Sequence, residues 1–134
     1  MRTMAQQRAE FALDRVLQSM GRITDKEKFA SFIAGAPAMI LQNGFGQTLA
    51  FWLAKGTKDG RINGNDKHIL LFDIVKDWLS LKDKDIRNNF ASSGERVGLM
   101  REISEMQQNK YLSAQSETLS LLEWVKRFAN ADLS

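Results

Sequence analysis

The sequence contains 134 residues, a length near that of a single domain, and 43% of them are hydrophobic while 26% are charged. This composition is typical of a folded globular protein, and the absence of cysteine excludes a disulfide scaffold, a thiolate zinc site and a cysteine nucleophile. The formal net charge of +3 permits contact with a polyanion but does not require it.

Two helices are predicted at the start of the chain. Apolar residues at three- and four-residue spacing indicate a helix over residues 3–20, and Gly21 follows it as a C′ glycine would. A second helix is expected to begin at Thr24, because Thr24 and Glu27 have the spacing of a capping box. Gly35 is expected to interrupt this second helix.

Two further helices are predicted to meet at a sharp corner. Residues 36–44 form the first of them, with Pro37 in its first turn, where a missing amide proton costs nothing. Asn43 and Gly44 both tolerate left-handed backbone angles and are expected to end this helix. Residues 45–56 form the helix that follows the corner.

The second half of the chain is also predicted to be helical, after an exposed loop over residues 57–65. Residues 66–81 are apolar over more than half of the helix circumference, which is typical of a helix at the centre of a bundle. Further helices are predicted over 93–106 and 113–133, and no stretch alternates long enough to be a convincing strand.

The fold class is therefore predicted to be all-α, a compact bundle of about six helices in a single domain over residues 1–134. The three tryptophans are expected to pack in the core rather than to form stacking platforms for bases. The side chains expected to be largely buried are Phe11, Trp52, Trp78, Leu122 and Phe128.

Residue types that carry catalysis or bind metals are sparse. His68 is the only histidine, and we expect it to be a partly exposed residue in the first turn of its helix. Two carboxylate pairs have helical spacing, Asp73 with Asp77 and Glu102 with Glu105, but neighbouring basic residues favour solvated faces over metal binding. We therefore predict no catalytic residue, no metal, no cofactor and no small-molecule substrate.

The corner contains the residues Asn43, Gly44, Gly46 and Gln47, which superficially suggest a phosphate cradle. A P-loop closes on Gly-Lys-Ser/Thr, whereas Gln47 and Thr48 follow Gly46 here. We interpret these residues as a structural turn between two helices, and anion binding by the amides of a helix N-terminus is the alternative.

Three stretches together resemble the small helical subunit of the Cmr complex, the type III-B CRISPR effector. They are RAEFALDRV at 8–16, APAMILQNGFGQTLAFWLAKG at 36–56 and YLSAQSETLSLLEWVKRFANADL at 111–133. The middle stretch carries most of the resemblance, because a buried run ends in Asn-Gly and is followed by Gly-Gln-Thr-Leu-Ala-Phe. The segments 57–65 and 82–110 do not contribute to it.

The resemblance implies that several copies stack side by side as the minor filament, along the backbone subunits that hold the guide RNA. The expected partners are those other Cmr backbone subunits, further copies of this chain, the guide RNA and the target RNA. Guide–target pairing would supply sequence specificity, and this non-catalytic, cytoplasmic subunit would contact only the RNA backbone in antiviral defence. No membrane is expected, because the longest apolar run, 36–41, is far shorter than the roughly 20 residues of a membrane-spanning helix.

Phosphate contacts are expected from basic side chains near the first helix, in the loop at 55–61 and on the last helix. These candidates are Arg8, Arg15, Lys55, Lys58, Arg61, Lys126 and Arg127.

Alternative interpretations of the sequence stay open. The basic side chains could be ordinary solubilising charges, some of them neutralised by Glu10 or Asp59. The chain could be a protein–protein adaptor without RNA contact, and an enzyme would have to rely on His68. A DNA-binding regulator would use residues 45–56 as its recognition helix, which is too apolar to enter a groove.

Overall fold

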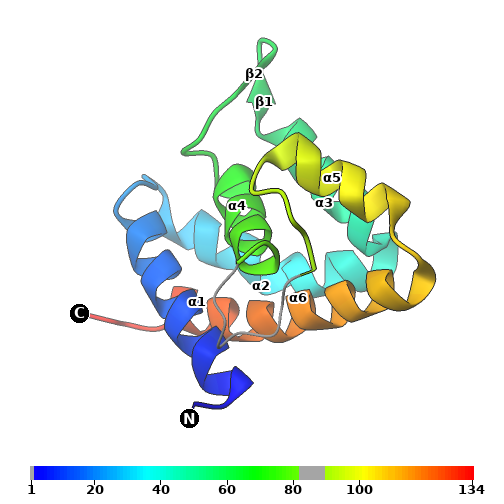
Figure 1. Ribbon diagram of the computed structural model, residues 1–134. Coiled ribbons are helices and arrows are strands. Elements are labelled where there is room, and N and C mark those ends of the chain that lie inside the picture. The colour runs from blue at the N-terminus through cyan, green and yellow to red at the C-terminus, as the bar shows by residue number, and fades with distance from the viewer. Residues whose placement is uncertain (1, 82–89) are drawn as a thin grey trace.

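The computed structural model describes residues 2–81 and 90–134 of the chain. Within these residues it confirms the predicted all-α bundle of about six helices (Figure 1). A small antiparallel hairpin, β1 (Thr57–Lys58) and β2 (Arg61–Ile62), lies between the third and fourth helices. The helices are α1 (Met4–Met20), α2 (Lys26–Asn43), α3 (Phe45–Lys55), α4 (Lys67–Leu79), α5 (Arg96–Glu105) and α6 (Gln108–Ala129).

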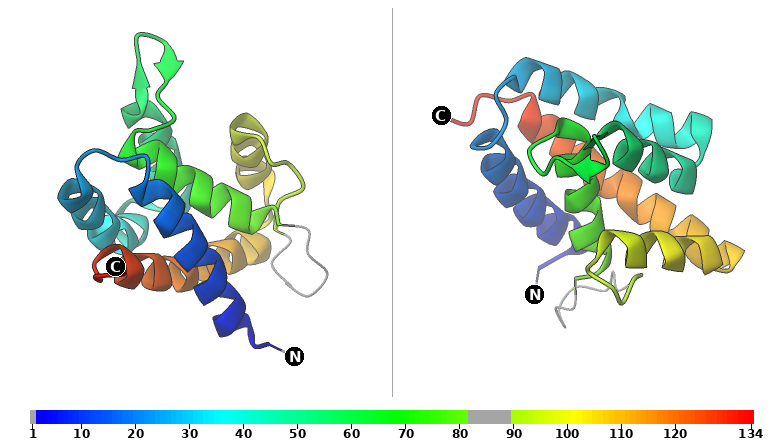
Figure 2. Two further views of the ribbon diagram at one scale, coloured as in Figure 1. Left: turned by 90° about the vertical axis from the view of Figure 1, so that its left-hand side faces the viewer. Right: turned by 90° about the horizontal axis from the view of Figure 1, so that it is seen from above.

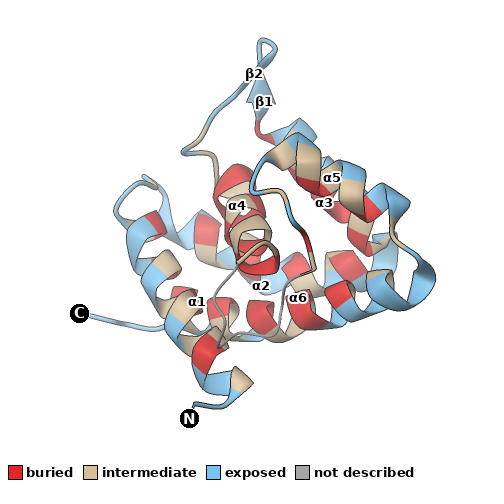
Figure 3. Cartoon of the chain, viewed as in Figure 1, coloured by how far each residue is buried: buried red, intermediate tan, exposed pale blue. Residues whose placement is uncertain are grey.

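Helix α4 lies at the centre of the bundle, as its wide apolar arc predicts. It contacts α1, α2, α3, α5 and α6, and it runs through the middle of the molecule in each view (Figures 1 and 2). Most of its surface is buried, whereas α1 and α6 each expose one side to solvent (Figure 3). Its buried side chains are Ile69, Leu70, Leu71, Phe72, Ile74, Val75, Trp78 and Leu79.

The prediction of buried residues is confirmed at the centre of the core and is wrong for two residues at its edge. Trp52, Trp78 and Leu122 are fully buried, but Phe11 and Phe128 are only partly buried. The Phe11 ring packs 5.0 Å from the Trp78 ring, centroid to centroid. Trp124 is also only partly buried, and it stacks on Phe128 near the end of α6. Helical spacing identifies the inward face of a helix but not how deeply each residue on that face lies.

Helix α2 is continuous where two helices were predicted. Gly35 does not interrupt it, and Pro37 lies inside it rather than in a first turn. Proline removes a single amide donor, and the apolar residues before and after it keep one buried face in helical register. These buried residues are Phe29, Ile33, Ala36 and Ile40. Packing of this face thus maintains the helix through a residue that disfavours it.

Several predicted helix ends also differ in the structure. The N-cap of α2 is Asp25, whose carboxylate accepts the Lys28 amide, so the predicted capping box at Thr24 is wrong. Gly21 follows α1 with φ −74° and is therefore not the expected left-handed glycine. Helix α6 begins at Gln108, earlier than predicted. None of the helices in the described ranges combines the length and apolar character needed to cross a membrane.

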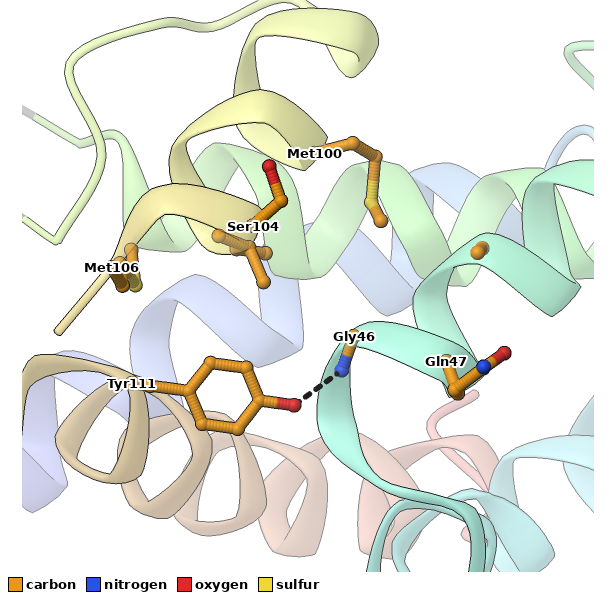
Figure 4. Close-up of a pocket in the computed structure, with 8 residues that line it drawn as sticks. Gly46, Gln47, Met100, Ser104, Met106 and Tyr111 are labelled. Atoms are coloured by element: carbon orange, nitrogen blue, oxygen red, sulfur yellow. Dashed lines mark hydrogen bonds between the residues drawn. The ribbon is translucent and has the colours of Figure 1, made fainter. Parts of the chain in front are cut away.

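The corner between α2 and α3 depends on one glycine. Gly44 has φ 90° and ψ 152°, a combination accessible essentially to glycine alone. It ends α2 and begins α3, and the Gly46 amide then donates to the Tyr111 hydroxyl of α6 at 2.9 Å (Figure 4). On the other side of the corner, the Thr48 hydroxyl donates to the Met39 carbonyl at 3.1 Å. The backbone conformation of Gly44 and the Thr48–Met39 hydrogen bond hold α3 against α2, and the Gly46–Tyr111 hydrogen bond ties α3 to α6.

We expect Trp78→Ala to lower the free energy of unfolding by about 3–5 kcal/mol, because it leaves a large cavity beside the central helix. Urea denaturation followed by circular dichroism measures this loss. Trp124→Ala is the matched control and is expected to cost less, because Trp124 is partly exposed. Equal stability of the Trp78→Ala variant and the parent would contradict the central position of α4.

Alanine at Gly44 and alanine at Gly35 should act in opposite directions. Both glycines have open space where a Cβ atom would lie, but only Gly44 has a positive φ. Gly44→Ala should destabilise by about 1–3 kcal/mol through backbone strain. Gly35→Ala should stabilise by about 0.5–1 kcal/mol, because alanine favours a helix interior. Thermal unfolding of the two variants measures both changes in stability. Stabilisation by both substitutions would show that a side chain at position 44 does not strain the corner.

Candidate nucleic-acid interface

Arg8, the first of the expected phosphate contacts, is engaged inside the fold. Its guanidinium donates from Nε and Nη2 to the carboxylate of Glu117 on α6, at 2.5 and 2.9 Å. Glu117 is only 9% exposed, and its Oε2 also accepts the indole N–H of Trp78 at 3.1 Å. The hydrogen bonds to Glu117 raise the pKa of Arg8 and outweigh the opposing effect of burial. This cluster joins α1, α4 and α6.

Arg15 is likewise paired with a carboxylate. Its guanidinium lies 2.5 Å from Oδ2 of Asp77 on α4 and 5.6 Å from the centroid of the Phe11 ring. Neither arginine is neutralised by Glu10, which instead pairs with Arg2. The first helix therefore directs its two candidate cations toward neighbouring helices.

Of the two carboxylate pairs noted in the sequence, Asp73 and Asp77 form ion pairs between helices, and Glu102 bonds the segment before α5. Asp73 accepts two hydrogen bonds from Arg96 of α5, and these raise the pKa of Arg96. Glu102 accepts from Ser92 and Ser93 in the segment that precedes α5. No cluster of three potential metal ligands occurs among the described residues.

The hairpin carries two of the candidate cations on an exposed projection. Its turn consists of Asp59, with φ 53°, and Gly60, with φ 75°, so both residues have the positive angles of a type I′ turn. Lys58 and Arg61 lie directly opposite each other in the register of the two strands. Directly opposed side chains share a face, and like charges there are destabilising. Figure 1 and the left view of Figure 2 show the hairpin projecting from the bundle, away from the N-terminus.

A shallow pocket beside the hairpin gathers further lysines. We call it the lysine pocket; its volume is about 480 Å³. Among the described residues no carboxylate lines it, and the nearby Asp66 is already bonded to the backbone and ring nitrogens of His68. The His68 ring in turn lies 4.5 Å from that of Phe32, centroid to centroid. The charged and aromatic residues of the lysine pocket are Lys28, Phe32, Phe51, Lys55, Lys67 and His68.

Two more pockets lie around the corner at Gly44. The amide pocket has a volume of about 610 Å³ and is lined by Met39, Gln42, Asn43, Gln47, Thr48 and Phe51. The methionine pocket, about 440 Å³, includes Met100, Met106 and Tyr111 (Figure 4). Gln47 lines both of them. The Gly46 amide already donates to the Tyr111 hydroxyl. The N-terminus of α3 therefore has fewer free amide donors for an anion than its sequence suggested.

The remaining candidates, Lys126 and Arg127, lie in the last turn of α6. Arg127 is exposed and Lys126 is partly buried. The end of α6 packs against the start of α2, where Asn130 and Ser31 line a common pocket. Ser31 also lines the lysine pocket, so the surface continues from the end of α6 across α2 toward the hairpin.

Residues 4–132 match the sequence pattern of Cas_Cmr5, described as a CRISPR-associated protein. The chain belongs to the Cas_Cmr5 family. This confirms the resemblance to the small helical subunit of the Cmr complex, and the match extends over regions that contributed nothing to that resemblance. The chain is also similar to the crystal structure of a CRISPR-associated Cmr5 family protein from Thermus thermophilus. The TM-score is 0.69 with 24% identity, covering 100% of both chains, and shows a shared fold.

Two basic residues of this Cas_Cmr5 chain that line the lysine pocket, Lys28 and Lys67, were not among the candidates from the sequence. They lie far apart in sequence, and only the packing of α2 against α3 and α4 brings them beside Lys55. The sequence interpretation also missed the hairpin, although Asp59-Gly60 is a strong local signal for a two-residue turn.

We expect Arg8→Ala to destabilise the Cas_Cmr5 fold by about 2–4 kcal/mol, because it leaves the buried Glu117 carboxylate without its cationic partner. Arg127→Ala is the control and should change stability little, because Arg127 is exposed. Chemical denaturation of both variants tests this difference. A combined Arg8→Ala and Glu117→Ala variant should recover part of the loss, whereas purely additive losses would contradict direct coupling.

Proposed function

We propose that this chain is the non-catalytic small subunit of a type III-B Cmr effector in the cytoplasm. Several copies stack as the minor filament, beside the other Cmr backbone subunits, and support binding of target RNA by the guide RNA in antiviral defence. The family match over residues 4–132 carries this proposal. Base pairing between guide and target supplies the sequence specificity, so this chain needs only to recognise the RNA backbone.

The hairpin and the lysine pocket are the surface that we assign to RNA. Lys58 and Arg61 face each other across the hairpin and are both exposed, an arrangement that costs stability unless an anion lies between them. Lys55 lies at the end of α3, where the hairpin begins. A phosphate backbone passing over this end of the molecule would neutralise three cations from adjoining elements.

We rank the other expected contacts below this group. Arg8 and Arg15 already donate to Glu117 and Asp77, so a phosphate would have to compete with a carboxylate for each of them. Lys126 and Arg127 form a second group, at the end of α6. We propose that RNA reaches this second group only after following the surface of α2.

A protein–protein adaptor without RNA contact is the second candidate. Exposed apolar side chains on α5 and α6 favour it, since Val97 is 64% exposed and Leu112 is 49% exposed. Such side chains suit contacts with other subunits, which both candidates require. The two functions therefore differ in the role of the cations rather than in that of this apolar surface.

Replacing both Lys58 and Arg61 with glutamine should weaken binding of every RNA sequence alike. The slope of log affinity against log salt concentration should fall by about one for each lost phosphate contact, hence by about two. Fluorescence anisotropy with labelled single-stranded RNA at several salt concentrations measures the slope. The matched control replaces Arg101 and Lys110, which are exposed on α5 and α6, and removes the same charge.

Identical slopes for the parent, the hairpin variant and the control variant would contradict RNA contact at the hairpin. If the hairpin variant also assembled normally with the other Cmr subunits, the adaptor function would take first place. Loss of binding to some RNA sequences but not others would contradict backbone recognition, because only guide pairing should depend on sequence.

A further inference from the structure

Phe51 forms a ridge between the lysine pocket and the amide pocket. Among the described residues, only Phe51 and Met39 line both pockets, and Phe51 lies on the outer face of α3 with 45% of its surface exposed. The other large aromatic side chain in the middle of this helix, Trp52, is fully buried and belongs to the core. A half-exposed phenyl ring between two pockets offers a flat apolar face to a ligand.

Cations gather on one side of this ring. The Lys55 ammonium lies over one face of the ring, 5.7 Å from its centroid, and Lys28 and Lys67 line the same pocket. Lys28 has a carboxylate nearby, that of Asp25, but the two groups are 3.9 Å apart and both are well exposed. Such a weak pair leaves the ammonium able to bind a phosphate group. This side of Phe51 therefore suits a phosphate attached to whatever covers the ring.

Side-chain amides gather on the other side. Gln42 and Asn43 come from the end of α2, and Gln47 comes from the first turn of α3. They line one pocket because the positive φ of Gly44 turns the chain sharply between them. Each amide has both a hydrogen-bond donor and an acceptor, and these are the groups that bind the edge of a nucleobase.

We propose that these two pockets and Phe51 form a subsite for one unpaired nucleotide of single-stranded RNA. The base stacks on the face of Phe51 opposite the Lys55 ammonium, with its edge toward the amides, and the adjoining phosphates contact Lys28, Lys55 and Lys67. A base within a duplex is already stacked and paired, so only a single-stranded or extruded nucleotide fits. This inference rests on the proposed RNA contact and adds a base contact to it. An acidic peptide would neutralise the lysines, but it would make no use of the exposed Phe51 ring or of the three side-chain amides.

The test compares two labelled RNA oligonucleotides of about 10 nucleotides, one with bases and one abasic throughout, a length within the site sizes of single-strand binding domains. The full chain should bind the oligonucleotide with bases at least about fivefold more tightly than the abasic one. Phe51→Leu should remove this difference by weakening binding of the oligonucleotide with bases. Phe51→Tyr keeps the ring and should retain the difference.

Leu112→Ala is the matched control, because Leu112 is also half-exposed and lies outside both pockets. Circular dichroism confirms that each variant is folded. Equal, salt-dependent binding of both oligonucleotides by the parent would overturn the nucleotide subsite and leave the proposed backbone contact standing. Absence of binding to either oligonucleotide at low salt would overturn both. Displacement of both oligonucleotides by polyglutamate, with no effect of the bases, would mark the surface as a docking site for an acidic protein and overturn the subsite.

Discussion

The carboxylate of Glu117 is the group that fixes how the helices of the bundle align. It is buried on α6, and it accepts hydrogen bonds from the Arg8 guanidinium of α1 and the Trp78 indole of the central helix α4. A buried carboxylate is costly unless its oxygens are satisfied, and the observed packing of the three helices brings both of its partners within hydrogen-bond distance. Apolar packing supplies the driving force, and this polar cluster selects one alignment of the helices.

Ion pairs between helices explain why the small net charge gives little guidance about which cations lie on the surface. Arg8 and Arg15 are occupied by ion pairs between helices, as is Arg96 beside Asp73. Pairing inside the fold removes acids as well as bases from the surface balance. What matters for an anionic partner is the set of cations left outside, and among the described residues five of these lie at the hairpin and the lysine pocket: Lys28, Lys55, Lys58, Arg61 and Lys67.

Gly44 links the fold to the candidate interface. Its backbone angles, closed to other residues, turn the chain between α2 and α3 and bring amides from both helices to one pocket. The same turn places α3 so that Trp52 points into the core while Phe51, its neighbour in sequence, lies on the surface. One glycine thus organises both the packing of α3 and the surface that α3 presents.

The helical class, the central position of α4 and the corner at Gly44 could all be predicted from the chain alone. These features depend on local periodicity and on backbone angles, which neighbouring residues dictate. The continuity of α2 through Pro37 could not, because it depends on burial of a helix face that outweighs the loss of a single amide donor. Which cations face solvent is likewise a matter of packing. Nothing in the local sequence distinguishes Arg8 from Lys55, but Arg8 pairs with Glu117, which lies 109 residues further along the chain.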